Sequence, residues 1–153
     1  MERTNDVDRA LIAGLQADGR RTNRSLAEEV GLAPSTTLQR VRDLEQSGVI
    51  TGYHAEVDLR ALGRRVEAVV FVRLRPKTDA TVAAFLDHVW EIPDVISAGL
   101  ISGADDAMVR VAVPDTDRLR DVVLRQIADH PSVVDERTTL LFEHRHRHVI
   151  EPA

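Results

Sequence analysis

Apolar residues in the first third of the chain recur at the spacing of amphipathic helices. The spacing and its end signals predict three helices, from an Asn5 cap to Gly19, from a Thr22 cap to Gly31, and from Pro34 to Gly48. Only Gly31-Leu32-Ala33 separates the second helix from the third, and such a short turn is typical of a helix-turn-helix motif. Residues 49–57 then predict a short β wing.

The third predicted helix has a polar face that suits contact with DNA. Its expected buried stripe is Leu38, Val41 and Leu44. The opposite face carries Ser35, Thr36 and Gln39. A recognition helix reads base edges with its N-terminal residues, and glutamine can pair with adenine through two hydrogen bonds, so we expect these three side chains to contact bases. The expected phosphate contacts are Arg24, Arg40 and Arg42.

The second half of the chain changes to a succession of strands and helices. Strand patterns cover residues 66–74, 95–102, 107–113 and 134–142, and helical patterns cover residues 79–90 and 115–128. A Pro-x-Val sequence follows each of these helices, at Pro93 and Pro131, so the strand–helix–strand unit occurs twice. The predicted fold class is therefore α+β, with an N-terminal winged helix-turn-helix followed by a ferredoxin-like βαββαβ domain.

Two helices cover only one face of such a sheet. The first strand directs Ala68, Val70 and Val72 to one face, and Val69 and Phe71 to the other. The second face therefore keeps apolar area, which predicts that copies of the chain pair through it.

Composition and charge narrow the class of partner. With 43% hydrophobic residues the chain can bury a core, and it has no cysteine and no apolar run near the ~20 residues of a membrane span. We expect a cytoplasmic protein with no signal peptide and no membrane partner. Aromatic residues make up only 3%, which argues against binding single strands by stacking. The net charge of -5 arises after residue 65, because residues 1–65 hold ten basic and ten acidic residues.

Two segments of the first half carry a specific resemblance. Residues 20–32 read RRTNRSLAEEVGL, and residues 40–53 read RVRDLEQSGVITGY. Their RV-x-x-LE and GVI-x-GY motifs are similar to those of the Lrp/AsnC (feast/famine) family of transcription regulators. In the second half, PDV at residues 93–95, SGADD at 102–106, VPD at 113–115 and PSV at 131–133 resemble that family's ligand-sensing domain in the same order. The resemblance covers about residues 4–143.

The resemblance implies a transcriptional regulator that binds a double-stranded DNA operator and responds to a small-molecule effector, often an amino acid. It also implies a homodimer that assembles into a higher oligomer. The implied effector-binding residues are Gly103, Ala104, Asp105 and Asp106. Asp106 matches the family's acidic position and is expected to receive the ammonium group of the effector. Asp105 and Ala107 stand where the family often has aromatic residues, and Ala33 stands where it usually has a capping Ser or Thr.

A histidine tract near the end of the chain raises the question of a metal site. His144, His146 and His148 alternate with arginines, which repel a cation, so we expect a solvated tail or a subunit contact and no metal. We also expect no cofactor and no enzyme activity, because the nucleophile-elbow, phosphate-loop and zinc-protease motifs are absent from the sequence. Two alternatives stay open, a small ferredoxin-like enzyme or an RNA-binding protein, each with an N-terminal helical dimerisation module.

These patterns divide the chain into three parts. Residues 1–58 form the winged helix-turn-helix DNA-binding domain, and residues 59–65 form a linker with Gly63 as a candidate hinge. Residues 66–153 form a ferredoxin-like effector-sensing and oligomerisation domain with a C-terminal tail.

Overall fold

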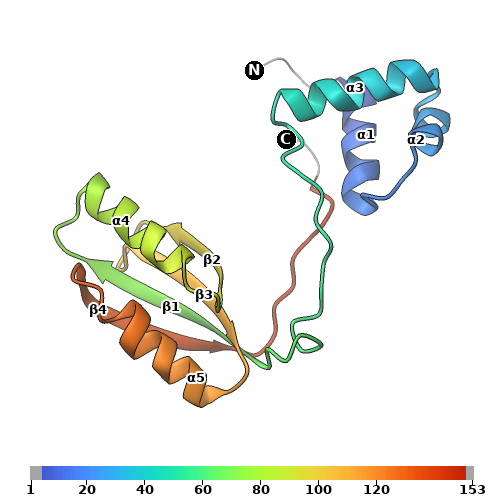
Figure 1. Cartoon of the computed structure of the whole chain (residues 1–153). Helices are drawn as coiled ribbons and strands as arrows, with labels where there is room; N and C mark the ends of the chain where they lie inside the picture. Colours follow the sequence, from blue (N-terminus) through green and yellow to red (C-terminus); the bar gives the residue numbers. More distant parts are fainter. Residues whose placement is uncertain (1–4, 151–153) are drawn as a thin grey trace. The chain divides into compact units, whose positions relative to one another are not determined.

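The structure, a computed structural model, describes residues 5–150 and divides the chain into two compact units (Figure 1). The N-terminal unit contains the residues up to Glu56 together with the segment that begins at Arg145. The second unit is Val57–His144. The division differs from the sequence-based boundaries, because the segment after His144 belongs with the helical unit rather than with the sheet.

The N-terminal unit is built from the three predicted helices, α1 (Asp6–Ala17), α2 (Asn23–Val30) and α3 (Pro34–Gln46). Two of them carry the expected N-caps: Asn5 Oδ1 accepts a hydrogen bond from the Asp8 N–H at 2.9 Å, and Thr22 Oγ1 accepts one from the Ser25 N–H at 3.1 Å. The third helix begins after Ala33 with no capping side chain, as its sequence predicts. Gly31 ends α2 in the left-handed conformation, with φ of 67°, and so provides the tight turn into α3.

The buried face of α3 differs from the prediction. Leu38, expected in the core, is 39% exposed. Thr37 is wholly buried instead, and Leu44 is buried as predicted. The core stripe thus follows Thr37, Val41 and Leu44, at the i, i+4, i+7 spacing of a helix face. Threonine tolerates burial here because its hydroxyl donates a hydrogen bond to the Ala33 carbonyl at 3.2 Å.

The segment predicted to form a β wing contains no β-strand in the structure. Residues 49–57 form no strand, and Val49, Tyr53 and Val57 are each about half exposed. A strand needs a neighbour to satisfy its backbone groups, and no strand of the described N-terminal unit offers one. The segment begins instead with the Val49 and Ile50 N–H groups, which both donate to the Leu44 carbonyl at 3.0 Å and complete the C-terminal end of α3.

The second unit has the predicted βαββαβ order. Its elements are β1 (Val66–Leu74), α4 (Asp79–Trp90), β2 (Val95–Leu100), β3 (Ala107–Val113), α5 (Thr116–Asp121), a π-helical continuation of α5 (Val122–Ile127), and β4 (Val133–Leu141). The strands form an antiparallel sheet in the order β2-β3-β1-β4, as the ferredoxin-like arrangement requires. Strand β2 ends at Leu100 rather than at residue 102, so six residues rather than four connect it to β3.

The core of this unit lies between the sheet and the two helices that cover one of its faces (Figure 1). Its wholly buried members include Ala68, Val70, Val72 and Leu74 from β1, and Phe85, Val89 and Ile127 from the helices. The alternation along β1 is confirmed, because Val69 and Phe71 are partly exposed and pair with Arg110 and Met108 of β3 on the other face. Among the described residues, no helix is both long and apolar enough to cross a lipid bilayer.

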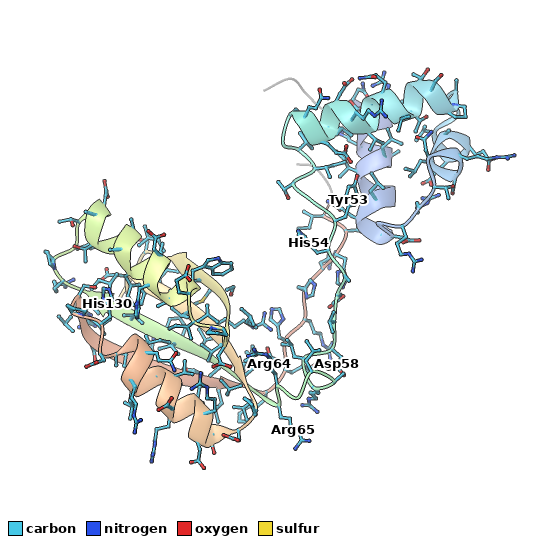
Figure 2. All side chains as sticks on the ribbon, in the orientation of Figure 1. Tyr53, His54, Asp58, Arg64, Arg65 and His130 are labelled. Carbon is cyan, nitrogen blue, oxygen red and sulfur yellow. The ribbon has the colours of Figure 1, made fainter. Side chains whose placement is uncertain are left out.

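The linker forms a turn that is fastened to the second unit. The Arg64 N–H donates to the Leu59 carbonyl at 2.9 Å, and Gly63 has a φ of 78°, which favours glycine. The Arg64 guanidinium, at the junction with β1 (Figure 2), binds the buried Asp94 carboxylate at 2.8 Å. Asp94 also binds Arg118 of α5 at 2.6 Å, so these two arginines neutralise the buried carboxylate and fix the start of β1.

Candidate functional site

The exposed face of α3 is the first candidate site. Ser35, Thr36 and Gln39 are all exposed, as the sequence predicts, and α2 and α3 are joined by the short turn of a helix-turn-helix. The Gln39 Nε2 donates a hydrogen bond to Asp43 Oδ1, one helical turn later, at 2.8 Å. Both side chains are exposed, so the Gln39 amide can exchange this bond for one to a base edge.

The three candidate phosphate-binding arginines lie in different surroundings. Arg24 pairs with Glu28 on the exposed face of α2, at 3.1 Å, and both side chains are more than two-thirds exposed. Arg40 is half-buried and pairs with Asp8 of α1 at 3.0 Å, so it also fastens α3 to α1. Arg42 is exposed and forms no ion pair within residues 5–150. Of the three, Arg42 is the most readily available to a phosphate group.

The segment after α3 is held by a residue that sequence reasoning did not assign. The Tyr53 hydroxyl donates a hydrogen bond to Glu45 Oε1 at 2.9 Å. Partial burial, and then this bond to a carboxylate, raise the pKa of Tyr53 above its ordinary value, so the hydroxyl keeps its proton and its role as donor. The GVI-x-GY motif therefore supplies, through Tyr53, a contact that fixes the segment to the end of α3.

The candidate effector turn is the connection between β2 and β3. Gly103 has a φ of 147°, and nothing lies within 4 Å of the position that a Cβ would occupy. Asp106 is buried, its Oδ2 accepts a hydrogen bond from the Leu74 N–H at 2.9 Å, and its Oδ1 lies 2.6 Å from the Lys77 Nζ. Lys77, and then the Leu74 N–H, lower the pKa of Asp106, so the carboxylate is charged despite its burial.

Cations surround the same turn. Asp105 pairs with Arg137 of β4 at 2.9 Å, and the Arg137 guanidinium lies 4.8 Å from the centre of the Phe71 ring. The Arg73 Nε donates to the Ala104 carbonyl at 3.3 Å. Sequence reasoning identified the acids but missed these basic partners, because they lie about 30 residues away in the sequence and only the pairing of β1 with β3 and β4 brings them close.

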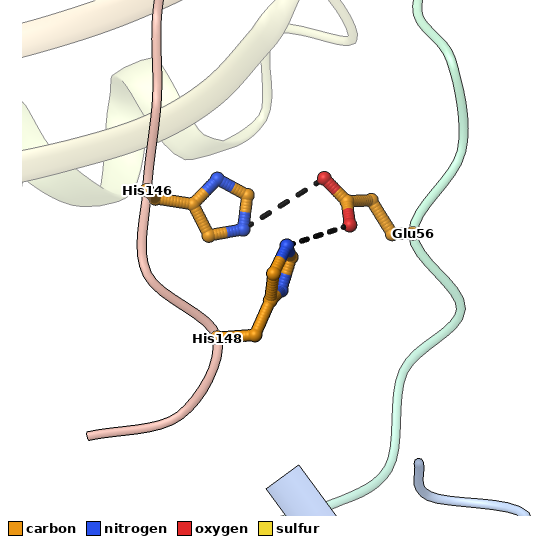
Figure 3. A group of neighbouring side chains, drawn as sticks. All are labelled: Glu56, His146 and His148. Atoms are coloured by element: carbon orange, nitrogen blue, oxygen red, sulfur yellow. Dashed lines mark ion pairs between the residues drawn. The ribbon is translucent and has the colours of Figure 1, made fainter. Parts of the chain in front are cut away.

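Two histidines of the tract lie close to a single acidic residue. His146 and His148 both point toward Glu56 (Figure 3), with their Nε2 atoms 3.8 Å and 3.1 Å from its two carboxylate oxygens. His144 is not part of this group. The sequence shows the alternation of the histidines, but Glu56 lies 90 residues before His146, and no local signal links them.

The two units together define a class of protein. A helix-turn-helix with an exposed polar second helix is a DNA-binding module, and a ferredoxin-like sheet with a charged turn at its edge is suited to binding a small polar molecule. The description "winged helix-turn-helix DNA-binding" matches residues 4–51, and "Lrp/AsnC ligand binding domain" matches residues 67–149. The chain belongs to the Lrp/AsnC family of transcriptional regulators.

Relatives extend over nearly the whole chain. The transcriptional regulator AldR of Mycolicibacterium smegmatis is 36% identical over 139 residues, which cover 91% of this chain and 81% of AldR. A leucine-responsive regulatory protein of Rhizobium meliloti is 35% identical over 134 residues, covering 88% of this chain and 86% of that protein. The crystal structure of a Neisseria meningitidis transcriptional regulator in complex with L-methionine has a TM-score of 0.86 and 26% identity, covering 95% of both chains. The named relatives are transcriptional regulators rather than enzymes.

Proposed function

We propose that this regulator binds a specific double-stranded DNA operator through α3, and that an amino acid or related metabolite modulates its activity or its assembly. The observation that carries the DNA-binding part is the exposed face of α3, where Ser35, Thr36 and Gln39 stand next to the helix-turn-helix turn. In this arrangement the three polar side chains read base edges. Arg42 and Arg24 contact phosphates, and Arg40 does so where the DNA backbone competes with Asp8.

Binding assays with the full chain test the assignment of α3. Duplexes selected from a random pool supply a specific site, and a scrambled duplex supplies the non-specific reference. We expect Gln39→Ala to weaken specific binding by about 1–3 kcal/mol and to leave non-specific binding unchanged. Gln46→Ala, an exposed glutamine at the other end of α3, is the matched control.

The arginines should behave differently in the same assay. Arg42→Ala should weaken binding to both duplexes alike and reduce the salt slope by about one unit, because one phosphate contact is lost. If Gln39→Ala weakened both duplexes equally, Gln39 would not be a base-reading residue.

We place the effector beside residues Gly103, Ala104, Asp105 and Asp106. The L-methionine complex of the Neisseria meningitidis relative supports an amino acid as the class of ligand. Both acids of the turn already pair with cations, so a ligand ammonium group must displace Lys77 from Asp106 or Arg137 from Asp105. Both cations are more than half exposed and free to turn toward the ligand carboxylate. The ammonium group of an amino acid would then pair with the aspartate, and the displaced cation would pair with its carboxylate.

A thermal-shift screen of the twenty amino acids tests this site. A ligand at about 100 times its dissociation constant stabilises the folded protein by roughly 2.7 kcal/mol, which is a measurable shift. Asp106→Asn should remove the shift while its amide oxygen still accepts from the Leu74 N–H. Asp135→Asn, an exposed acid that is 3.8 Å from Arg73, is the control. A full response from Asp106→Asn would place the effector elsewhere.

We further propose that the regulator works as a homodimer that assembles into a higher oligomer. The sheet face opposite the helices supports pairing, since it presents Val69, Phe71, Met108 and Leu141 with the Glu67–Arg110 ion pair among them. Two helix-turn-helix units in a dimer would bind half-sites about one DNA turn apart.

A further inference from the structure

We infer that Glu56, His146 and His148 form a binding site for a divalent transition-metal ion such as Zn²⁺. The three ligand atoms, two imidazole nitrogens and a carboxylate oxygen, all lie within 4.8 Å of one another. The two imidazole rings lie with their centres 4.3 Å apart, and both point toward the carboxylate (Figure 3). The site is independent of the DNA and effector sites proposed above, because it shares no residue with either.

The ligand set matches the chemistry of these ions. Two histidines and one carboxylate are a recurring set of protein ligands for zinc and for ferrous iron, and they leave at least one coordination position for water. A tetrahedral ion with bonds of about 2.0–2.2 Å holds its ligand atoms roughly 3.4 Å apart. His148 Nε2 is already 3.1 Å from one carboxylate oxygen and His146 Nε2 is 3.8 Å from the other, so small side-chain rotations suffice.

The neighbouring arginines do not block this site. Successive side chains of an extended segment point to opposite sides, and the residue between His146 and His148 is Arg147. The two histidines therefore share a side without it. A neutral imidazole binds a metal ion through a ring nitrogen, and the Glu56 carboxylate supplies the negative charge that such an ion requires.

The surroundings also position the ligands. The Ile150 N–H donates to Gln16 Oε1 of α1 at 2.7 Å, which fastens the segment just after His148 to α1. Glu56 and His148 line a 490 Å³ pocket with the C-terminal end of α1, so a bound ion is reached by water from the pocket. The tract is thus held in place by a contact other than its ion pairs.

A bound ion would link the two chain segments that connect the units. The chain passes between its two units after Glu56 and again before Arg145. An ion that joins Glu56 to His146 and His148 ties these two passages together, next to the points where they leave the N-terminal unit. Bound metal therefore restricts both connections at once.

Metal titration of the full, untagged chain tests the inference. At pH 7.5, calorimetry with Zn²⁺ should show one ion per chain, and the dissociation constant should rise at least about tenfold in His148→Gln and in Glu56→Gln. His144→Gln, a histidine of the same tract outside the group, should bind within twofold of the wild type.

Two further measurements test which side chains bind the ion and whether the ion restricts the connecting segments. With Cu²⁺ as the probe, electron paramagnetic resonance should show two nitrogen ligands in the wild type and one in His146→Gln. Zn²⁺ should slow tryptic cleavage after Arg60 and after Arg147 in the wild type, but not in the His146→Gln/His148→Gln double variant. The inference is overturned if the wild type binds no Zn²⁺ below 100 µM, if the double variant binds as tightly, or if cleavage is the same with and without the ion.

Discussion

The two units of the chain differ in how many of their residues are buried in a core. In the N-terminal unit the buried apolar side chains are few, chiefly Leu11, Leu26, Ala27 and Leu44, and most positions of α3 are exposed. In the second unit, whole faces of β1 and β3 are buried beneath two helices. Because the core of the N-terminal unit is small, the exposed face of α3 remains available to bind DNA. The larger core of the second unit stabilises the sheet, so the turn between β2 and β3 can contain residues that are uncommon in the family without loss of the fold.

The largest effect should come from the core of the second unit. Phe85 is wholly buried, and Phe85→Ala should lower the free energy of unfolding of this unit by about 3–5 kcal/mol. Trp90, the only tryptophan, lies in α4, so its fluorescence during urea unfolding reports this unit alone. Leu124→Ala, at a 54% exposed position, should change little. A loss below 1 kcal/mol for Phe85→Ala would mean that the core collapses around the missing ring.

The two faces of the sheet should respond differently to a charged side chain. Phe71 lies on the face without helices, and Phe71→Lys should leave the monomer folded but weaken dimerisation by about 100-fold, because a charge is buried without a partner. Lysine is preferred to an acid here, since Arg137 stacks on Phe71 and would pair with a carboxylate. Light scattering over a range of concentrations measures the change, with the exposed Leu124→Lys as control. An unchanged dimer would show that this face is not the contact.

The stability of the N-terminal unit should depend on the N-caps of its helices. Helix α3 alone among the helices α1 to α5 begins without a capping hydrogen bond, so Ala33→Ser should stabilise the N-terminal unit by about 1 kcal/mol. Thr22→Ala, which removes the cap of α2, should destabilise it by a similar amount. Thermal unfolding followed by circular dichroism at 222 nm gives both values. Stabilisation by Thr22→Ala would contradict the capping argument.

The smallest effect concerns pH. Burial, and then the charge of His88, lower the pKa of His130 below its ordinary value, so the folded protein disfavours the charged ring. The unfolded state then binds more protons, and the free energy of unfolding of the second unit should fall as pH drops through about 6.5, levelling off below the folded-state pKa. His130→Gln should flatten this dependence in Trp90-monitored unfolding, and His54→Gln, in the other unit, should not. An equal slope in both variants would assign the dependence to other groups.

Much of the fold is predictable because its signals are local. The capping residues, Pro34 and the glycines delimit the helices within a residue or two, and the alternation along β1 assigns Val70 to the core and Phe71 to the opposite face. The sequence predicts the turn between β2 and β3 but makes it four residues long instead of six, because the length of a hairpin turn depends on where the strands cease to pair.

The errors arise where a residue's environment depends on distant partners. Hydrophobicity alone predicts Leu38 in the core, but the packing of α3 buries Thr37, whose hydroxyl donates a hydrogen bond to the Ala33 carbonyl four residues earlier. Apolar residues predict a wing over residues 49–57, yet within residues 5–150 these residues pair with no strand. Whether an apolar segment becomes a strand depends on its neighbours rather than on itself.

Caps, turn residues and hydrophobic periodicity act within a few residues, so the sequence alone predicts the helices, the strands of the sheet, their order and the family resemblance. The pairing of the charged groups depends instead on the folded chain. The tertiary structure sets Lys77 against Asp106, Arg137 against Asp105, and Glu56 against two histidines that follow it by about 90 residues. Electrostatic interactions act through space over a few ångströms, so their partners are fixed by strand pairing and by the return of the chain, which local sequence does not encode.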